Sequence, residues 1–261
     1  MDAIWRQPDR VSLETEAGLQ PMQLVREMWQ SGPVRLGFEP AEAGVRIWLE
    51  APGAAPKRLH LGWHSPVQAG WRFLGDAWER GYGDLEWRGI VPERVMPWYV
   101  LAWDGQQAAG LGVRTDPAAF AYWQVDGGGF HLTLDVRCGD AGVRPGERRI
   151  ELATVIAGAA NERPFRFAVD FCHRLCPAPR LPAAPVYGAN DWYYAYGENS
   201  AAQILEDTRT LAELTAGLPD RPFSVIDAGW SNRPGETSCD TGVRTHGNER
   251  FPDMAGLAQQ I

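Results

Sequence analysis

The sequence predicts an antiparallel β-sandwich domain followed by the first part of a (β/α)8 TIM barrel, so the chain is expected to be a multidomain protein with α and β structure. From residue 34 onward, short runs of alternating polar and apolar residues are separated by Gly and Pro, which is typical of a sandwich. After a proline-rich stretch the pattern changes to strand, helix and strand over residues 186–226. That order is the repeating unit of parallel α/β structure.

The expected sandwich strands are short and alternate with period two. The clearest covers residues 130–136, and the three glycines at 127–129 predict a tight hairpin turn before it. Within residues 95–103, Pro97 indicates an edge strand or a strand entry. Residues 1–33 are expected to form an irregular lead-in, with a short helix or strand at 24–29. The remaining expected strands cover residues 45–49, 58–61 and 150–156.

A helix and a stiff connector are expected at the end of the sandwich. Residues 165–176 predict a helix whose buried side carries Phe165, Val169, Cys172 and Cys176. Residues 177–185 contain four prolines in nine residues, and these lack the N–H groups that a helix or a sheet needs. We therefore place the sandwich domain at 1–176, the linker at 177–185 and the truncated barrel, as its first two βα units, at 186–261.

The second domain is expected to contain an amphipathic helix between two strands. Ser200 and Gln203 have capping-box spacing, and Gly217 supplies a C-terminal stop. We expect strands at 186–188 and 225–226, the second buried on both faces as a central parallel strand. Asp253 is expected to help start a later helix. The apolar face of the first helix comprises Ile204, Leu205, Thr208, Leu211, Ala212 and Thr215.

Composition argues against several classes of partner. The net charge of −8 disfavours nucleic acid, because binding phosphates requires a basic surface. The sequence contains no run of eighteen apolar residues, so it predicts no membrane span. The first ten residues lack the apolar core of a signal peptide, so we expect a cytoplasmic protein. No metal and no cofactor are expected, because the spacing of the cysteines suits buried free thiols better than metal ligands. The four cysteines are Cys138, Cys172, Cys176 and Cys239.

Polar and aromatic residues gather directly after the two expected strands of the second domain. Residues 190–192 (Asn-Asp-Trp) follow the first, and residues 227–230 (Asp-Ala-Gly-Trp) follow the second. Strand carboxyl ends hold the ligand sites of parallel α/β folds. A carboxylate there can accept hydrogen bonds from sugar hydroxyls while an indole packs on the ring. The residues alone leave open the alternative that Asp227 caps a turn and Trp230 belongs to the core.

One stretch of the sandwich carries a further candidate. Residues 75–84 combine glycines, charges and aromatic residues, which indicates an ordered loop. The loop is expected either to lie at the domain interface, with its charges on Asp76, Glu79 and Arg80, or to contact the sugar through Trp78. The candidate sugar-binding residues are therefore Asn190, Trp192, Asp227, Trp230 and Trp78.

Three segments resemble a known family. Residues 190–192 (Asn-Asp-Trp), 225–230 (Val-Ile-Asp-Ala-Gly-Trp) and 248–254 (Asn-Glu-Arg-Phe-Pro-Asp-Met) are similar to the first two βα units of melibiase-type α-galactosidases, in glycoside hydrolase clan D. In that family a sandwich precedes a (β/α)8 barrel. The resemblance implies that Asp227 holds a sugar hydroxyl in the −1 subsite and that Trp192 lies near the sugar. Ala228 stands where the family has a second Asp, which leaves the sugar preference open.

The resemblance implies a retaining glycoside hydrolase acting on α-galactosides or similar α-linked sugars. Its nucleophile and acid/base are aspartates on later barrel strands, about 5–5.5 Å apart, and we expect both beyond Ile261. The chain alone is therefore expected to be an inactive fragment of an enzyme. The alternatives are a non-catalytic carbohydrate-binding or structural module, and a galactosyltransferase of the raffinose-synthase kind. The expected partner is an oligosaccharide or glycoside, and the resemblance allows a homo-oligomer formed through the sandwich.

Overall fold

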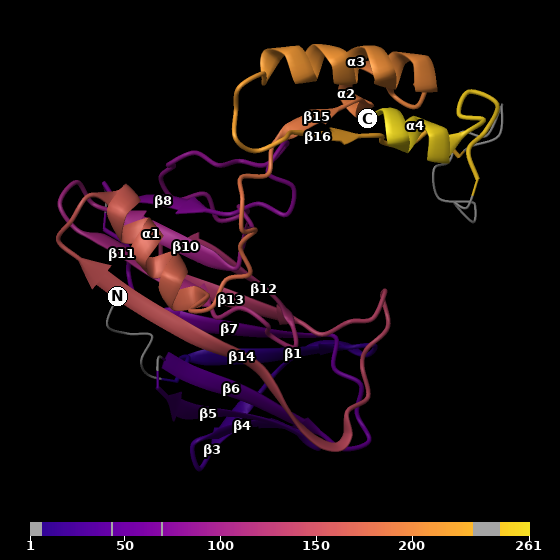
Figure 1. Cartoon of the computed structure of the whole chain (residues 1–261). Coiled ribbons are helices and arrows are strands. Elements are labelled where there is room, and N and C mark those ends of the chain that lie inside the picture. The colour runs from indigo at the N-terminus through magenta and orange to yellow at the C-terminus, as the bar shows by residue number, and fades with distance from the viewer. Residues whose placement is uncertain (1–6, 43, 69, 232–245) are drawn as a thin grey trace. The chain divides into compact units, whose positions relative to one another are not determined.

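The computed structural model describes residues 7–42, 44–68, 70–231 and 246–261 (Figure 1). The chain divides into two units, Met1–Pro179 (unit 1) and Arg180–Ile261 (unit 2). Each unit has buried clusters of its own, and each is described by itself.

Unit 1 is built from two sheets whose strands pair antiparallel. A six-stranded sheet has the order β2-β1-β7-β13-β12-β9, and an eight-stranded sheet has the order β3-β4-β5-β6-β14-β11-β10-β8. The strands are β1 (Arg10–Thr15), β2 (Gly18–Pro21), β3 (Gln23–Val25), β4 (Met28–Ser31), β5 (Val34–Ala41), β6 (Gly44–Ala51), β7 (Arg58–His64), β8 (Arg72–Gly75), β9 (Met96–Pro97), β10 (Tyr99–Trp103), β11 (Ala108–Val113), β12 (Phe120–Asp126), β13 (Gly129–Asp135) and β14 (Gly146–Ala160).

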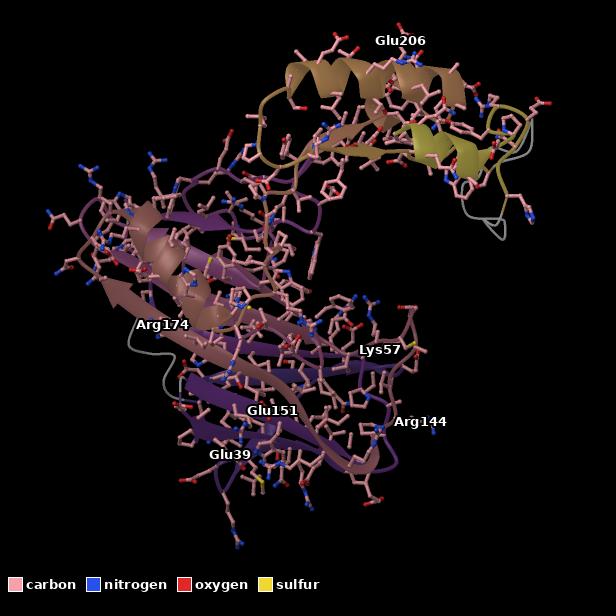
Figure 2. All side chains as sticks on the ribbon, viewed as in Figure 1. Glu39, Lys57, Arg144, Glu151, Arg174 and Glu206 are labelled. Atoms are coloured by element: carbon pink, nitrogen blue, oxygen red, sulfur yellow. The ribbon has the colours of Figure 1, made fainter. Side chains whose placement is uncertain are left out.

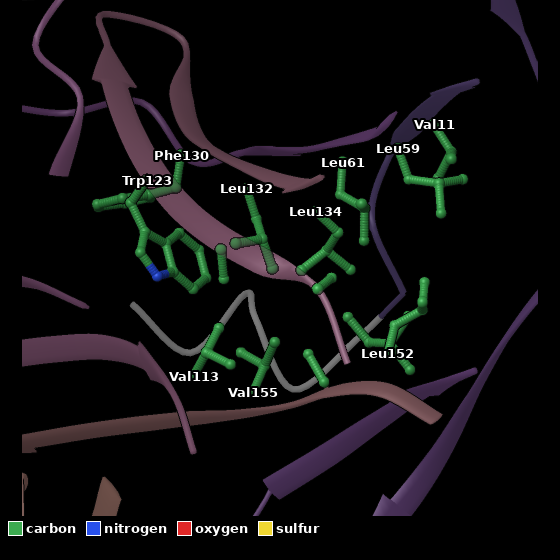
Figure 3. Close-up of a cluster of buried hydrophobic side chains, with 14 of the residues drawn as sticks. Val11, Leu59, Leu61, Val113, Trp123, Phe130, Leu132, Leu134, Leu152 and Val155 are labelled. Carbon is green, nitrogen blue, oxygen red and sulfur yellow. The ribbon is translucent and has the colours of Figure 1, made fainter. Parts of the chain in front are cut away.

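The main core lies between these two sheets, as expected of a β-sandwich (Figure 3). Leu61 and Leu132 of the six-stranded sheet and Leu152 and Val155 of the eight-stranded sheet all belong to it. Burying one such aliphatic side chain contributes roughly 1.5–3 kcal/mol. The predicted hairpin is also confirmed, because Asp126 pairs with Gly129 across a two-residue turn.

Helix α1 (Pro164–Leu175) covers the outer face of the eight-stranded sheet. Its buried residues are Phe167, Phe171 and Leu175, so the predicted buried side was wrong. Two apolar stripes at four-residue spacing compete on this helix, and the one with two Phe and a Leu buries more apolar area than the one containing the cysteines. Phe165, on the other stripe, is 82% exposed.

The amino-terminal region is more regular than the sequence indicated. Residues 1–33 were expected to be irregular, but β1 to β4 occupy most of residues 10–31. Strands β2 and β3 are exposed along their whole length, so they lack the alternation that reveals a half-buried strand. Residues 24–29 lie in the β3–β4 hairpin, in which Arg26 and Glu27 have positive φ angles.

The single strand predicted over residues 95–103 is split in two. Strand β9 ends the six-stranded sheet, whereas β10 pairs within the eight-stranded sheet. Between them Trp98 has a φ of +64°, so the backbone turns from one sheet into the other. The prediction that Pro97 marks an edge is confirmed, because β9 is an edge strand.

Unit 2 contains a strand-helix-strand unit with two further helices. Strands β15 (Gly188–Asn190) and β16 (Phe223–Val225) pair in parallel. Helix α3 (Ala201–Leu214) connects them, and Ser200 caps it by accepting a hydrogen bond from the Gln203 N–H. Short helix α2 (Trp192–Ala195) precedes α3, and α4 (Met254–Gln260) follows later. The core of this unit consists of Ile204, Phe251 and Leu257.

Two predictions for these strands need correction. The first strand was expected at 186–188 but begins at Gly188. The second was expected to be buried on both faces, yet Phe223 and Val225 are 55% and 46% exposed. Helix α3 covers one face, where Thr208 hydrogen-bonds to Ser224. Because parallel strands joined by a helix occur in both barrels and open sheets, the barrel stays a prediction.

Charged side chains lie on the surface of unit 1, including Glu39, Arg144 and Glu151 (Figure 2). Glu151 pairs with Arg46 at 3.1 Å. Such exposed ion pairs contribute little stability, about 0–1 kcal/mol each. In the described part of the chain, no helix is long and apolar enough to span a membrane.

The prediction of buried thiols is wrong for the three cysteines that the structure describes. Cys138 and Cys172 are exposed, and Cys176 is half-buried. The cysteine stripe of α1 faces outward because the stripe with Phe167 and Phe171 occupies the buried side. Cys239 lies outside the described residues, which contain no group of three or more side chains that could hold a metal ion.

Candidate functional site

The two strand ends of unit 2 place two of the predicted site residues in contact. Asn190 ends β15 and lies opposite Val225 of β16, and Asp227 follows two residues later. The Asn190 side-chain amide donates to Asp227 Oδ2 at 2.8 Å, and the Ala228 N–H donates to Asp227 Oδ1 at 2.7 Å. These two hydrogen bonds fix the orientation of a half-buried carboxylate at the carboxyl end of the parallel strands.

Asp191 ties the two strand ends together and was not among the predicted ligands. Its side chain is 2% exposed. Asp191 Oδ1 accepts from the Asp227 N–H at 2.7 Å, and Oδ2 accepts from the Asn199 side-chain amide. Both oxygens of this buried carboxylate therefore bind groups of the chain itself, which makes Asp191 a positioning residue for Asp227.

Asn199 holds the loop after β16 through hydrogen bonds to its backbone. The side chain is 1% exposed, and its amide also donates to the carbonyl oxygens of Asp227 and Ala228, at 3.4 and 3.2 Å. Its Oδ1 is buried without a hydrogen-bond partner among the described residues and faces Gly229. A Cβ at Gly229 would lie 2.6 Å from this oxygen, so only glycine fits there.

Two residues later in the chain, Asn248 and Arg250, bind the backbone of the loops that form the site. Arg250 donates through Nη2 to the carbonyl oxygens of Gly197 and Gly229, at 2.7 and 3.1 Å. Asn248 donates through Nδ2 to the same Gly229 oxygen at 2.7 Å. The segment 248–254 thus clamps the two loops that follow β15 and β16. As expected, Asp253 starts α4, because its Oδ1 accepts from the Gly256 N–H at 2.8 Å.

The predicted aromatic ligands of unit 2 have different surroundings. Trp192 begins α2 and is half-buried, in edge-to-face contact with Tyr196 at 5.8 Å between ring centroids. Trp230 packs against the core of Ile204, Phe251 and Leu257. The structure thus places the Trp230 ring partly in the core while Trp192 stays beside the strand ends.

A tyrosine-rich surface lies next to Trp192. Tyr193, Tyr194 and Tyr196 are each more than half exposed, and Tyr194 donates its hydroxyl hydrogen bond to Asp207 on α3. Burial and this hydrogen bond raise the pKa of Tyr194 to about 12. The phenol is therefore protonated at neutral pH and serves as a donor.

Trp78 belongs to unit 1, whereas the other candidates belong to unit 2, so its surroundings are described within unit 1 alone. It follows β8 in a loop that Asp76 organises by accepting from Arg80 at 2.6 Å. Its indole is 54% exposed and meets the rings of Trp98 and Phe120 edge-to-face, at 5.7 and 6.0 Å. Whether this loop contacts unit 2 or a sugar stays a prediction. The loop from 231 to 248, with Cys239 and Asp240, lies mostly outside the described residues.

The cluster at the strand ends is suited to recognition of hydroxyl groups. A carboxylate offers about four acceptor positions, and Asp227 is held in place by the Ala228 N–H, Asn190 and Asp191. Retaining cleavage needs a second carboxylate across the scissile bond. Asp191, the neighbouring carboxylate, is buried and doubly hydrogen-bonded. These described residues therefore suit binding rather than bond cleavage.

Comparison with known proteins gives only weak structural likenesses. No family model and no curated protein matches the sequence. One similar structure is a Kfla1895 mutant in complex with isomaltose, with 14% identity and a TM-score of 0.35 over 86% of this chain and 37% of that one. Another is a cycloalternan-degrading enzyme from Trueperella pyogenes in complex with cycloalternan, with 13% identity and a TM-score of 0.37 over 84% of this chain and 30% of that one.

The chain thus spans about a third of the length of these two structures. TM-scores this low support no argument about activity or substrate. The resemblance to melibiase-type α-galactosidases rests on the sequence motifs alone.

Proposed function

We propose that the protein acts on carbohydrates as part of a retaining glycoside hydrolase for α-galactosides or similar α-linked sugars. The observation that carries the proposal is the oriented carboxylate of Asp227 at the strand ends, with Asn190 at 2.8 Å. Strand carboxyl ends are the ligand side of parallel α/β folds. In this proposal Asp227 and Asn190 hold adjacent sugar hydroxyls, and Trp192 flanks the ring.

The described residues take the binding role in this proposal. Asp191 is buried and serves to position Asp227, and no described residue matches the nucleophile or acid/base of the family that the motifs resemble. Ala228 replaces a usual Asp of that family, so the preference among galactose, glucose and related sugars is set by other contacts. A transferase of the raffinose-synthase kind would use the same hydroxyl contacts.

Calorimetric titration of the 261-residue chain with methyl α-D-galactopyranoside tests the proposal. Because hydrogen bonds to a charged group contribute about 1.5–3 kcal/mol, Asp227→Asn should weaken binding by about 10- to 150-fold. Asp253→Asn is the matched control: it removes a carboxylate from the same unit, and Asn is an equally good helix cap. Equal affinities of Asp227→Asn and the parent chain would remove Asp227 from the sugar site.

A turnover assay separates binding from catalysis. We expect the 261-residue chain to bind the sugar without releasing nitrophenol from p-nitrophenyl α-galactoside, because a retaining pair of carboxylates is needed for cleavage. Nitrophenol release that is lost in Asp227→Asn would show that the chain itself is catalytic. A panel of α-glucosides and α-galactosides in the same titration then assigns the sugar.

A further inference from the structure

Unit 1 contains a cavity of about 400 Å³ beside α1, between the start of β10 and the end of β11. Its volume falls in the range of small-molecule pockets, about 300–1,000 Å³. All of its lining residues belong to unit 1, whereas the cluster around Asp227 belongs to unit 2. The lining residues are Trp98, Tyr99, Val113, Thr115, Asp116, Pro117, Cys172, Leu175 and Cys176.

Trp98 in this cavity has a backbone conformation that is unusual for a bulky residue. Its φ is +64°, in the left-handed region that large side chains rarely adopt. Three hydrogen bonds hold it: its N–H donates to the Ala121 carbonyl at 3.0 Å, and its carbonyl accepts from the Val113 N–H at 2.8 Å and the Trp123 indole N–H at 3.3 Å. Strain of this kind clusters at functional sites, and here the three hydrogen bonds hold the backbone that carries the indole ring.

The aromatic surface around Trp98 continues beyond the cavity. Trp78 meets the Trp98 ring edge-to-face at 5.7 Å, and Phe120 meets the Trp78 ring in the same way. Both Trp78 and Phe120 are more than half exposed. A second hollow of about 240 Å³ shares Trp98 and Pro117 with the first and is lined by Phe120. The two hollows adjoin at Trp98 and Pro117, and together we name them the Trp98 cleft.

Two polar side chains of the cleft remain available for a ligand. Asp116 is exposed, and its carboxylate makes no hydrogen bond or ion pair with any described residue. The Tyr99 hydroxyl likewise has no hydrogen-bond partner in the described part of the chain. Burial and the charge of Asp76 raise the pKa of Tyr99, so its hydroxyl stays protonated and can donate. The cleft therefore offers an acceptor and a donor beside an apolar ring.

The charges around the cleft favour an uncharged ligand. Asp116 would repel an anion. The other charged groups at or near the cleft pair with one another, Arg80 with Asp76 at 2.6 Å and Arg137 with Asp135 at 2.8 Å, so they present little net charge to a ligand. A neutral ring with hydroxyls on its edge and C–H groups on its face matches the indole, the carboxylate and the phenol together. We propose that the Trp98 cleft binds a pyranose ring of an uncharged saccharide.

The test uses the 261-residue chain carrying Asp227→Asn, so that sugar binding at the strand ends of unit 2 does not contribute. The probe is methyl α-D-glucopyranoside, followed through the ¹⁵N–¹H signal of the Trp98 indole, which Trp98→Phe assigns. We expect a saturable shift of this signal. Tyr99→Phe should weaken binding by about 2- to 10-fold, the usual effect of one neutral hydrogen bond. Tyr82→Phe is the matched control, because Tyr82 is a highly exposed tyrosine of unit 1 that does not line the cleft.

A cavity-filling variant gives an independent readout. Cys176→Phe occupies the space beside α1 and should abolish the shift while leaving the thermal unfolding of the chain nearly unchanged. Three results would overturn the proposal: no shift at any concentration that the solubility of the sugar allows, equal affinities of Tyr99→Phe and its parent, or binding of benzylamine in place of the sugar. Because Asp227 is already replaced, failure here leaves the proposed function of unit 2 intact.

Discussion

Replacing Gly229 by alanine should loosen the candidate site more than the same change at any open glycine of unit 2. Gly229 has a φ of +110°, and an added Cβ would lie 2.3 Å from the Gly197 carbonyl oxygen and 2.6 Å from Asn199 Oδ1. Gly217 is the matched control, because its φ is +88° and nothing lies within 4 Å of an added Cβ. Both variants carry the cost of a left-handed alanine, about 1–2 kcal/mol. Only Gly229→Ala adds a steric clash with backbone atoms.

The clash should cost about 1–3 kcal/mol, the usual range for forcing extra methyl groups into packed structure. Hydrogen exchange followed by mass spectrometry measures it as the opening free energy of peptides covering α3. Relative to Gly217→Ala, the opening constant for Gly229→Ala should rise by about 5- to 150-fold, since a tenfold change corresponds to about 1.4 kcal/mol. Equal opening constants in the two variants would refute the idea that close packing of Gly229 against Gly197 and Asn199 positions Asp227.

Three further outcomes are expected. Ser200→Ala removes the cap of α3 and should lower the opening free energy of its first turn, measured by hydrogen exchange, by about 1 kcal/mol. Ser200→Asp keeps a capping side chain and should leave that free energy nearly unchanged. Phe171→Ala should lower the free energy of unfolding of unit 1 in urea by about 3–5 kcal/mol, because the Phe171 ring is buried between α1 and the sheet. Phe165→Ala should change that free energy little, because Phe165 is exposed. Burial alone would raise the pKa of Asp135, but hydrogen bonds from Arg137 and Arg58 outweigh it and lower the pKa to about 2. Because the pKa of Asp135 in the folded protein lies below the ordinary 3.8, the ionised carboxylate contributes about 2 kcal/mol to the free energy of unfolding above pH 4. This contribution is lost as the pH falls toward 2. Urea titrations at several pH values should therefore show a shallower acid loss in Asp135→Asn.

Features that depend on nearby residues could be predicted from the sequence. The cap of α3 and the start of α4 each need one side chain and a backbone N–H three residues later, so the spacing identifies them. The strand β13 and its hairpin follow from strict alternation and glycines. Asn190 and Asp227 are 37 positions apart, but their meeting follows from the general rule that parallel strands end at the same edge of a sheet.

Features that depend on particular contacts between distant residues could not be predicted from the sequence. Trp98 has no local signal for a positive φ, because the hydrogen bonds that hold it come from other strands. The buried side of α1 depends on which stripe fits the sheet beneath it. Asp191 and Asn199 become positioning residues only because β15 and β16 lie side by side. Their neighbours in sequence do not distinguish them from solvent-facing polar residues.

The central claim is that Asp227 and Asn190 receive sugar hydroxyls at the strand ends of unit 2. The most direct measurement follows the side-chain amide ¹⁵N–¹H signals of Asn190 and Asn199 while methyl α-D-galactopyranoside is added to the chain. The account predicts a saturable shift of the Asn190 amide, which donates to Asp227, and loss of that shift in Asp227→Asn. An unmoved Asn190 amide under conditions where the sugar demonstrably binds the chain would contradict it.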